Sequence, residues 1–111
     1  MNHAVQHWRA QRFTAVILVP LCLWFIFSLA TTTTLDHAAA HAWIKTPVHS
    51  VFLIVFILAL FYHAQLGLQV VIEDYVGSDS LRNRGIMLGK IALYLTGMVA
   101  VLAVLKITFG L

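Results

Sequence analysis

Three long apolar blocks, at 13–30, 48–72 and 86–109, constrain this chain more than any other feature of its sequence. Each approaches or exceeds the roughly 20 residues that a helix needs to cross the hydrocarbon of a bilayer. Charged residues make up only 10% of the chain, against about 25% in soluble domains. The sequence therefore predicts an all-α membrane protein, a single anchor domain over 1–111 with three transmembrane helices packed in a bundle.

The residues between the blocks divide the chain in the same way. We expect membrane helices over about 13–34, 47–72 and 86–109, with a short interfacial segment at 36–45 and an inner loop at 73–85. Thr46-Pro47 suits a helix start, because proline is tolerated in a first helical turn. The first block is longer than the apolar region of a signal peptide and lacks a small-residue cleavage site, so we expect it to be retained.

The basic residues predict the orientation. Lys and Arg are enriched in the cytoplasmic loops of membrane proteins. Five of the seven fall before the first block or between the second and third blocks: Arg9, Arg12, Arg82, Arg84 and Lys90. The amino terminus is therefore expected on the cytoplasmic or matrix side of a multi-pass protein. This topology explains the net charge of +3, so the charge does not indicate nucleic-acid binding.

His63 is the only His, Asp, Glu, Lys or Arg residue in the interior of the second apolar block, because the other histidine, His49, is the second residue of the block. A polar ring at membrane depth is costly and is a functional-site hypothesis by default. On a helix, Gly67 follows His63 by about one turn on the same face and would let a flat macrocycle or another helix approach closely. A neutral imidazole is well suited to ligate haem iron. Because no other expected span contains a histidine, a second imidazole has to come from a partner chain.

Other interpretations of these histidines stay open at this point. His63 could make an interhelical hydrogen bond or line a hydrated cavity without binding any cofactor. His37, His41 and His49 could suggest a metal site on the outer side, but no cysteine or acidic cluster accompanies them beyond Asp36.

The segment from His63 to Tyr75 resembles one known family. It contains a histidine in the second of three membrane helices, then Gly67, then the pair Asp74-Tyr75 at the end of the helix. In these features the chain resembles the small hydrophobic membrane anchors of succinate dehydrogenase, respiratory complex II. A weaker match is Arg12-Phe-Thr14-Ala15, which resembles the basic residue and Thr-Ala pair at the start of the family's first span.

The resemblance implies roles for individual residues. His63 would be one axial ligand of haem b, and Tyr75 would donate a hydrogen bond to a ubiquinone carbonyl oxygen. A phenol can donate to that oxygen as it gathers negative charge during reduction. Asp74 would orient basic groups or relay protons at the same quinone site, although a solvated helix-end carboxylate is the alternative. Arg12, with His7 nearby, would pair with a haem propionate, or Arg12 would serve only as a positive-inside anchor.

The resemblance also implies partners. A flavoprotein subunit with FAD would oxidise succinate, and an iron–sulfur subunit would carry electrons to ubiquinone. A second membrane anchor subunit would supply the other haem ligand within the bilayer. The chain itself has neither a nucleotide-binding glycine motif nor a cysteine set for clusters. The membrane would be a bacterial or mitochondrial inner membrane. Alternatives are a fumarate reductase anchor, or a non-redox membrane protein with His63 and Asp74 in a proton or ion path.

Overall fold

Each apolar block forms a long α-helix in the computed structural model, which describes residues 3–32 and 36–111. In hydrocarbon every backbone N–H and C=O must be bonded within the protein, and a helix achieves this within one segment. Four helices follow in order, and the described residues contain no strand: α1 His3–Thr31, α2 His37–Lys45, α3 Pro47–Tyr75 and α4 Asp79–Phe109. Three of them, α1, α3 and α4, are long and apolar enough to cross a membrane. The prediction of an all-α membrane protein with three membrane-length helices is confirmed.

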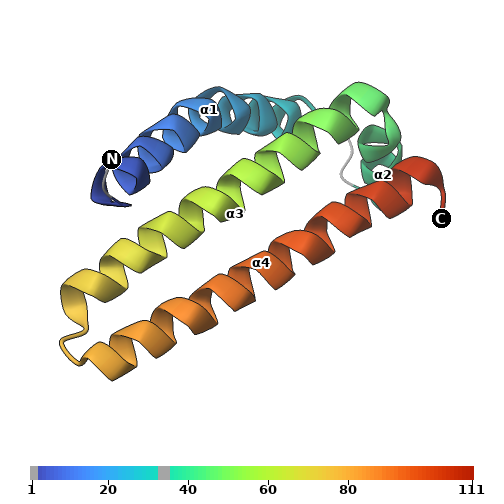
Figure 1. Cartoon of the computed structure of the whole chain (residues 1–111). Helices are drawn as coiled ribbons and strands as arrows, with labels where there is room; N and C mark the ends of the chain where they lie inside the picture. Colours follow the sequence, from blue (N-terminus) through green and yellow to red (C-terminus); the bar gives the residue numbers. More distant parts are fainter. Residues whose placement is uncertain (1–2, 33–35) are drawn as a thin grey trace.

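The central helix of the molecule is α3 (Figure 1). It packs against α1 on one side and against α4 on another, whereas α1 and α4 make no contact with each other among the described residues. The amino terminus and the turn between α3 and α4 lie at one end of the molecule, and α2 and the carboxyl terminus lie at the other (Figure 1). The 29 residues of α3 extend over about 44 Å, which exceeds the roughly 30 Å of bilayer hydrocarbon.

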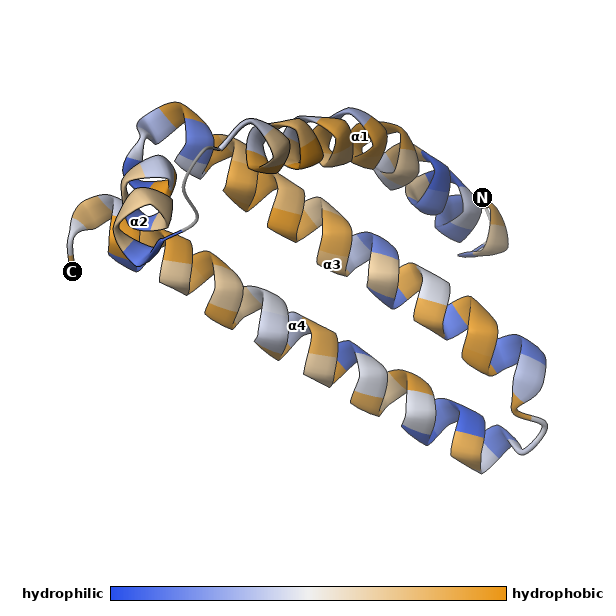
Figure 2. Ribbon diagram, turned by 180° about the vertical axis from the view of Figure 1, so that it is seen from behind, coloured by the Kyte–Doolittle hydropathy of each residue, from blue (hydrophilic) through white to orange (hydrophobic). Residues whose placement is uncertain are grey.

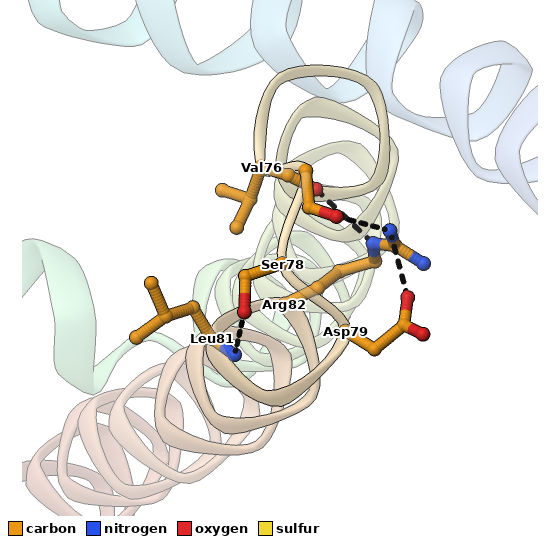
Figure 3. A network of polar contacts seen from close by, with 6 residues as sticks. Val76, Ser78, Asp79, Leu81 and Arg82 are labelled. Atoms are coloured by element: carbon orange, nitrogen blue, oxygen red, sulfur yellow. Dashed lines mark hydrogen bonds and ion pairs between the residues drawn. The ribbon is translucent and has the colours of Figure 1, made fainter.

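The long helices extend beyond the apolar blocks. Residues 73–85, expected as an inner loop, are mostly helical, and only residues 76–78 lie between α3 and α4. Figure 3 shows how this turn is stabilised. The Ser78 hydroxyl accepts a hydrogen bond from the Leu81 amide, and the Arg82 guanidinium donates to the carbonyls of Val76 and Gly77. Arg82 also pairs with Asp79 at 3.1 Å. These contacts satisfy backbone groups at both helix ends, so a three-residue connection is sufficient.

At the amino terminus, α1 already begins at His3, ten residues before the expected start. The stretch before residue 13 is polar but contains no proline or glycine, so nothing in it stops the helix. The last described helical residue of α1 is Thr31. The expected end near residue 34 falls outside the described residues.

At the opposite end, α2 joins the long helices through aromatic and hydroxyl contacts. The Asp36 carboxylate caps α2 by accepting from the Ala39 amide at 2.7 Å. Trp43 of α2 stacks on His49 of α3, with ring centroids 4.3 Å apart, and on Trp24 of α1 at 5.5 Å. This short helix therefore lies where an interfacial segment was expected, and it holds the carboxyl-terminal part of α1 and the amino-terminal part of α3 together.

Most of the molecular surface is apolar. Figure 2 shows hydrophobic residues along much of the length of the long helices, with many of the hydrophilic residues toward the amino terminus and the α3–α4 turn. Only four apolar side chains in the described part of the chain are buried: Leu18, Leu53, Leu66 and Val104. A chain with so small an internal core cannot be stable in water, and its exposed apolar surface must face lipid or other subunits.

Candidate functional site

His63 lies within α3 and contacts α1. Its Nδ1 atom is 2.9 Å from the Oγ1 of Thr14. Thr14 is one of the few buried polar residues, with 7% of its surface exposed, whereas His63 is half-buried. The interhelical hydrogen bond weighed from the sequence is therefore present, and it uses one of the two ring nitrogens.

The second ring nitrogen of His63, Nε2, makes no hydrogen bond with any residue that the structure describes. It is the atom with which the ring could bind a metal ion. One turn later, a Cβ atom placed on Gly67 would meet no heavy atom within 4 Å. The chain itself thus leaves this part of α3 uncovered, and a flat group or another helix has room to approach there.

The Asp74-Tyr75 pair forms the last two residues of α3. Asp74 is exposed, and Tyr75 is 84% exposed. Tyr75 follows His63 by twelve residues, so it lies about 18 Å further along the helix. The described residues therefore place a phenol and a carboxylate at the carboxyl end of α3 but do not enclose them in a pocket.

The structure places Arg12 and His7 on α1 without bringing them together. Arg12 is exposed, and its guanidinium carbon lies 5.2 Å from the centre of the Trp8 ring. The Nε2 of His7 is buried without a hydrogen-bond partner in the described part of the molecule. Arg12 is only two residues from Thr14, whereas His7 is seven residues away, about 10 Å along α1. Arg12 is thus close to the depth of His63, and His7 lies well toward the amino terminus.

Two grooves run along α3 between α1 and α4. The first has a volume of about 770 Å³, and its lining is apolar apart from Thr14, Tyr62 and Tyr94. The second, about 860 Å³, lies toward the amino-terminal end of α1 and contains a polar chain. In that chain the Tyr94 hydroxyl donates to Gln65, Gln65 donates to Gln69, and Gln69 donates to Glu73. His63 lines neither groove, whereas its contact partner Thr14 lines the first.

The outer histidines do not form a metal centre. The rings of His37 and His41 lie 6.0 Å apart, whereas His49 stacks on Trp43 and its Nδ1 is 2.8 Å from the Trp43 carbonyl. No group of three or more His, Cys, Asp or Glu side chains that could hold a metal ion occurs within residues 3–32 and 36–111. His49 therefore contributes to packing around α2, whereas His37 is exposed.

Comparison with known proteins decides the family. Residues 1–105 match the model of the succinate dehydrogenase/fumarate reductase transmembrane subunit family. The chain belongs to this family. It is 37% identical over 98 residues to the succinate dehydrogenase hydrophobic membrane anchor subunit of Rickettsia bellii, covering 88% of this chain and 78% of that protein. It is 38% identical to the corresponding subunit of Rickettsia felis over 82 residues, which cover 74% and 68% of the two chains.

A more distant relative carries a similar name. The succinate dehydrogenase membrane anchor subunit of Reclinomonas americana is 29% identical over 79 residues, covering 68% of this chain and 66% of that protein. No solved structure matches the chain significantly. As a membrane anchor of succinate dehydrogenase, the chain is part of an oxidoreductase, and its three apolar helices agree with a multi-pass inner-membrane protein.

For this membrane anchor, reasoning from the sequence singles out His63 but gives Thr14 no role. Thr14 stands out in the sequence only as part of the Arg12-Phe-Thr14-Ala15 match. The signal that could have found it is a hydroxyl in the first apolar block at a depth similar to that of His63. Which face of α1 meets α3 depends on tertiary packing, which the weak periodicity of an almost uniformly apolar helix does not reveal.

Proposed function

We propose that this chain provides one axial ligand of haem b and part of the ubiquinone site of a succinate:quinone oxidoreductase. The observation that carries the proposal is the hydrogen bonding of the two nitrogens of the His63 ring. Its Nδ1 is 2.9 Å from a buried hydroxyl, its Nε2 has no partner among the described residues, and uncovered helix surface follows at Gly67. These features fit an imidazole held for metal ligation, because such ligands usually bond through their other nitrogen to a supporting group.

The second axial ligand would come from a second membrane anchor subunit. The nearest histidine on α1 is His7, and it lies about 10 Å of helix from Thr14, too far along the axis to face His63 across one iron. The exposed apolar surface of α1, α3 and α4 supports a partner helix bundle as well as contact with lipid. Haem bound between the two anchors would supply a one-electron centre.

Within this chain, Thr14 would hold the ring of the ligand His63, and Arg12 would bind the polar edge of the haem. The Arg12 side chain is exposed and starts two residues from Thr14, so its fork of donors could reach a propionate at the inner side of the haem. His7 is the weaker candidate for the same contact because of its greater axial distance. Its buried, unpartnered Nε2 nevertheless requires a hydrogen-bond donor or acceptor from outside the described residues.

The ubiquinone site is assigned to the inner end of α3. Tyr75 would donate its hydroxyl proton in a hydrogen bond to a quinone carbonyl oxygen, and Asp74 would orient basic groups or relay protons. Both side chains are exposed at the helix end, which suits a site completed by neighbouring subunits. The iron–sulfur subunit would dock near the α3–α4 turn and deliver electrons that a flavoprotein subunit with FAD takes from succinate.

The direction of catalysis is proposed as succinate oxidation. The family description covers both succinate dehydrogenase and fumarate reductase, but the three relatives compared with this chain are all named for succinate dehydrogenase. The alternative of an ion path has less support, because His63 and Asp74 make no contact with each other.

The inner side of the membrane is assigned from the arginines. The amino terminus and the α3–α4 turn share one end of the molecule (Figure 1). Four of the seven basic residues lie at or near that end: Arg9, Arg12, Arg82 and Arg84. We assign that end to the cytoplasmic or matrix side.

The proposal is tested by reduced-minus-oxidised absorption spectra of the purified complex. His63→Ala is expected to remove the b-type haem signal while the flavoprotein and iron–sulfur subunits still co-purify. His49→Ala is the control, because that histidine lies at the outer end of the same helix and stacks on Trp43. An assembled His63→Ala complex with an unchanged haem spectrum would contradict ligation by this residue.

A further inference from the structure

The Thr14 hydroxyl has three neighbours within hydrogen-bond distance. Its Oγ1 lies 2.8 Å from the Ala10 carbonyl oxygen, 3.0 Å from the Gln11 carbonyl oxygen and 2.9 Å from Nδ1 of His63. Carbonyl oxygens can only accept, and a hydroxyl has a single proton to donate. When the hydroxyl donates that proton to the main chain of α1, the lone pairs of Oγ1 remain for His63.

We infer that Thr14 is a positioning residue for His63, and that its hydroxyl accepts a hydrogen bond from the Nδ1–H of the imidazole. This inference deepens the proposed haem ligation and rests on it. In a neutral imidazole only one nitrogen carries a proton. Placing it on Nδ1 leaves the lone pair of Nε2 free, which is the state required of an iron ligand.

The surroundings of Thr14 make this arrangement rigid. Thr14 is only 7% exposed, and in the membrane interior an unpaired polar group would be costly. The two carbonyl contacts fix the direction of the hydroxyl proton, and the contact with His63 fixes the ring across the α1–α3 interface. The contact with α1 thereby fixes the rotation of α3 about its own axis, and with it the direction of the His63 ring.

The hydrogen bond between Thr14 and His63 would have a different consequence if it ran in the opposite direction. If Thr14 donated its proton to Nδ1, the ring proton would reside on Nε2, and that nitrogen could not bind iron. The two polarities therefore predict different effects of removing the hydroxyl. Losing an acceptor at Nδ1 weakens the imidazole as a ligand, whereas losing a donor would favour the ligating tautomer.

The inference is tested on the whole purified complex with Thr14→Val, which removes the hydroxyl at nearly constant volume. We expect haem affinity to fall roughly tenfold, as is typical when a supporting group of a metal ligand is lost. The midpoint potential of the haem should rise, because a less basic imidazole stabilises the ferric state less. The low-spin ferric resonance should also shift, and Thr14→Ser should restore all three properties.

The chain offers a matched control in Thr96→Val. Thr96 on α4 donates to the Ala92 carbonyl at 2.7 Å, the same bond to a residue four positions earlier, but it is exposed and contacts no histidine in the described parts of the chain. This variant should behave as wild type. Thr14→Ala removes the same oxygen but puts no methyl group in its place. If the valine variant disturbs packing or assembly, the alanine variant is used to test the inference.

Two failures can be told apart in this series. If His63→Ala keeps the haem spectrum, the ligation itself is wrong, and the role of Thr14 falls with it. If His63→Ala loses the spectrum but Thr14→Val and Thr14→Ala both match Thr96→Val in affinity, potential and resonance, the ligation stands and the positioning role is overturned. A higher haem affinity in Thr14→Val would show the opposite polarity of the hydrogen bond.

Discussion

At the scale of single residues, His63 and Tyr75 of α3 differ in burial and in hydrogen bonding. His63 is half-buried, and one ring nitrogen is bonded within the chain while the other is left without a partner in the described residues. Tyr75 is 84% exposed, and no residue of the described chain covers it. The half-buried imidazole is supported within the chain because a ring at membrane depth needs hydrogen-bond partners. The phenol of Tyr75 needs no such support from the chain, because it is accessible at the end of α3.

Tyr75→Phe is expected to slow ubiquinone reduction by roughly tenfold or more, the scale of one hydrogen bond to a group that gathers charge. Succinate oxidation with an artificial acceptor that takes electrons before the membrane should stay unchanged. Both rates are measured on the same preparation of the complex.

Tyr62→Phe makes the same chemical change thirteen residues earlier on α3, at a hydroxyl that lies along the grooves between α1 and α4. It should leave both rates as in wild type. Equal loss of both activities in Tyr75→Phe, or loss of neither, would contradict a role of this phenol in the quinone step.

At the scale of helices, the sequence predicts which segments cross the membrane but not where the helices end. Hydropathy marks the part of a helix that lies in hydrocarbon, so the polar residues Glu73, Asp74 and Asp79 are expected in a loop. The structure keeps them helical because Ser78 and Arg82 bond the backbone groups at the turn. Capping of this kind depends on side-chain geometry, so the mean hydropathy of a sequence window does not predict it.

The rotation of each helix is equally hidden in the sequence. The residues that form the candidate site can be named from their spacing on α3, but the contact between Thr14 and His63 requires knowing which faces of α1 and α3 meet. Many large apolar residues of α1, α3 and α4 are exposed, so a polar stripe does not mark the outward face of each helix. The buried hydroxyl of Thr14 is the local feature that identifies the inner face of α1 at this depth.

The α3–α4 interface provides a stability prediction. A Cβ atom on Gly97 of α4 would lie 3.2 Å from Cγ and 3.4 Å from Cβ of Phe61 on α3. Gly97→Leu therefore forces atoms into space that Phe61 occupies, and we expect a loss of about 1–3 kcal/mol in stability. Thermal unfolding of the purified complex in detergent should show a lower Tm.

Thr96→Leu is the matched control, since it places the same side chain at the neighbouring exposed position of α4. Its Tm should stay close to that of wild type. A Gly97→Leu complex as stable as Thr96→Leu would mean that α3 and α4 do not pack through Gly97.

At the scale of the whole molecule, the chain is an incomplete bundle. The central helix α3 has α1 and α4 as neighbours, but these two do not touch each other among the described residues, and four buried apolar side chains form the internal core of the described chain. Stability must come from the bilayer and from further subunits. The proposed chemistry is incomplete in the same way, because His63 would need a second ligand from another subunit and Tyr75 would need a pocket completed by other subunits.

The amino terminus and the α3–α4 turn lie at the same end of the molecule, and this predicts the orientation of the chain in the membrane. We expect this end on the cytoplasmic side, because Arg9 and Arg12 lie in the amino-terminal half of α1, and Arg82 and Arg84 lie in the first two turns of α4. The short helix α2 lies at the opposite end (Figure 1). Cysteine labelling can distinguish the two ends, since Cys22 is the sole cysteine and can be removed as Cys22→Ser.

In that background, His41→Cys in α2 should react with a membrane-impermeant maleimide in intact bacterial cells. Ser80→Cys, beside the turn, should react only after the membrane is permeabilised, and the Cys22→Ser chain alone should not react at all. Labelling of Ser80→Cys but not His41→Cys in intact cells would reverse the orientation. The quinone site proposed at Tyr75 would then lie on the outer face, away from an iron–sulfur subunit in the cytoplasm.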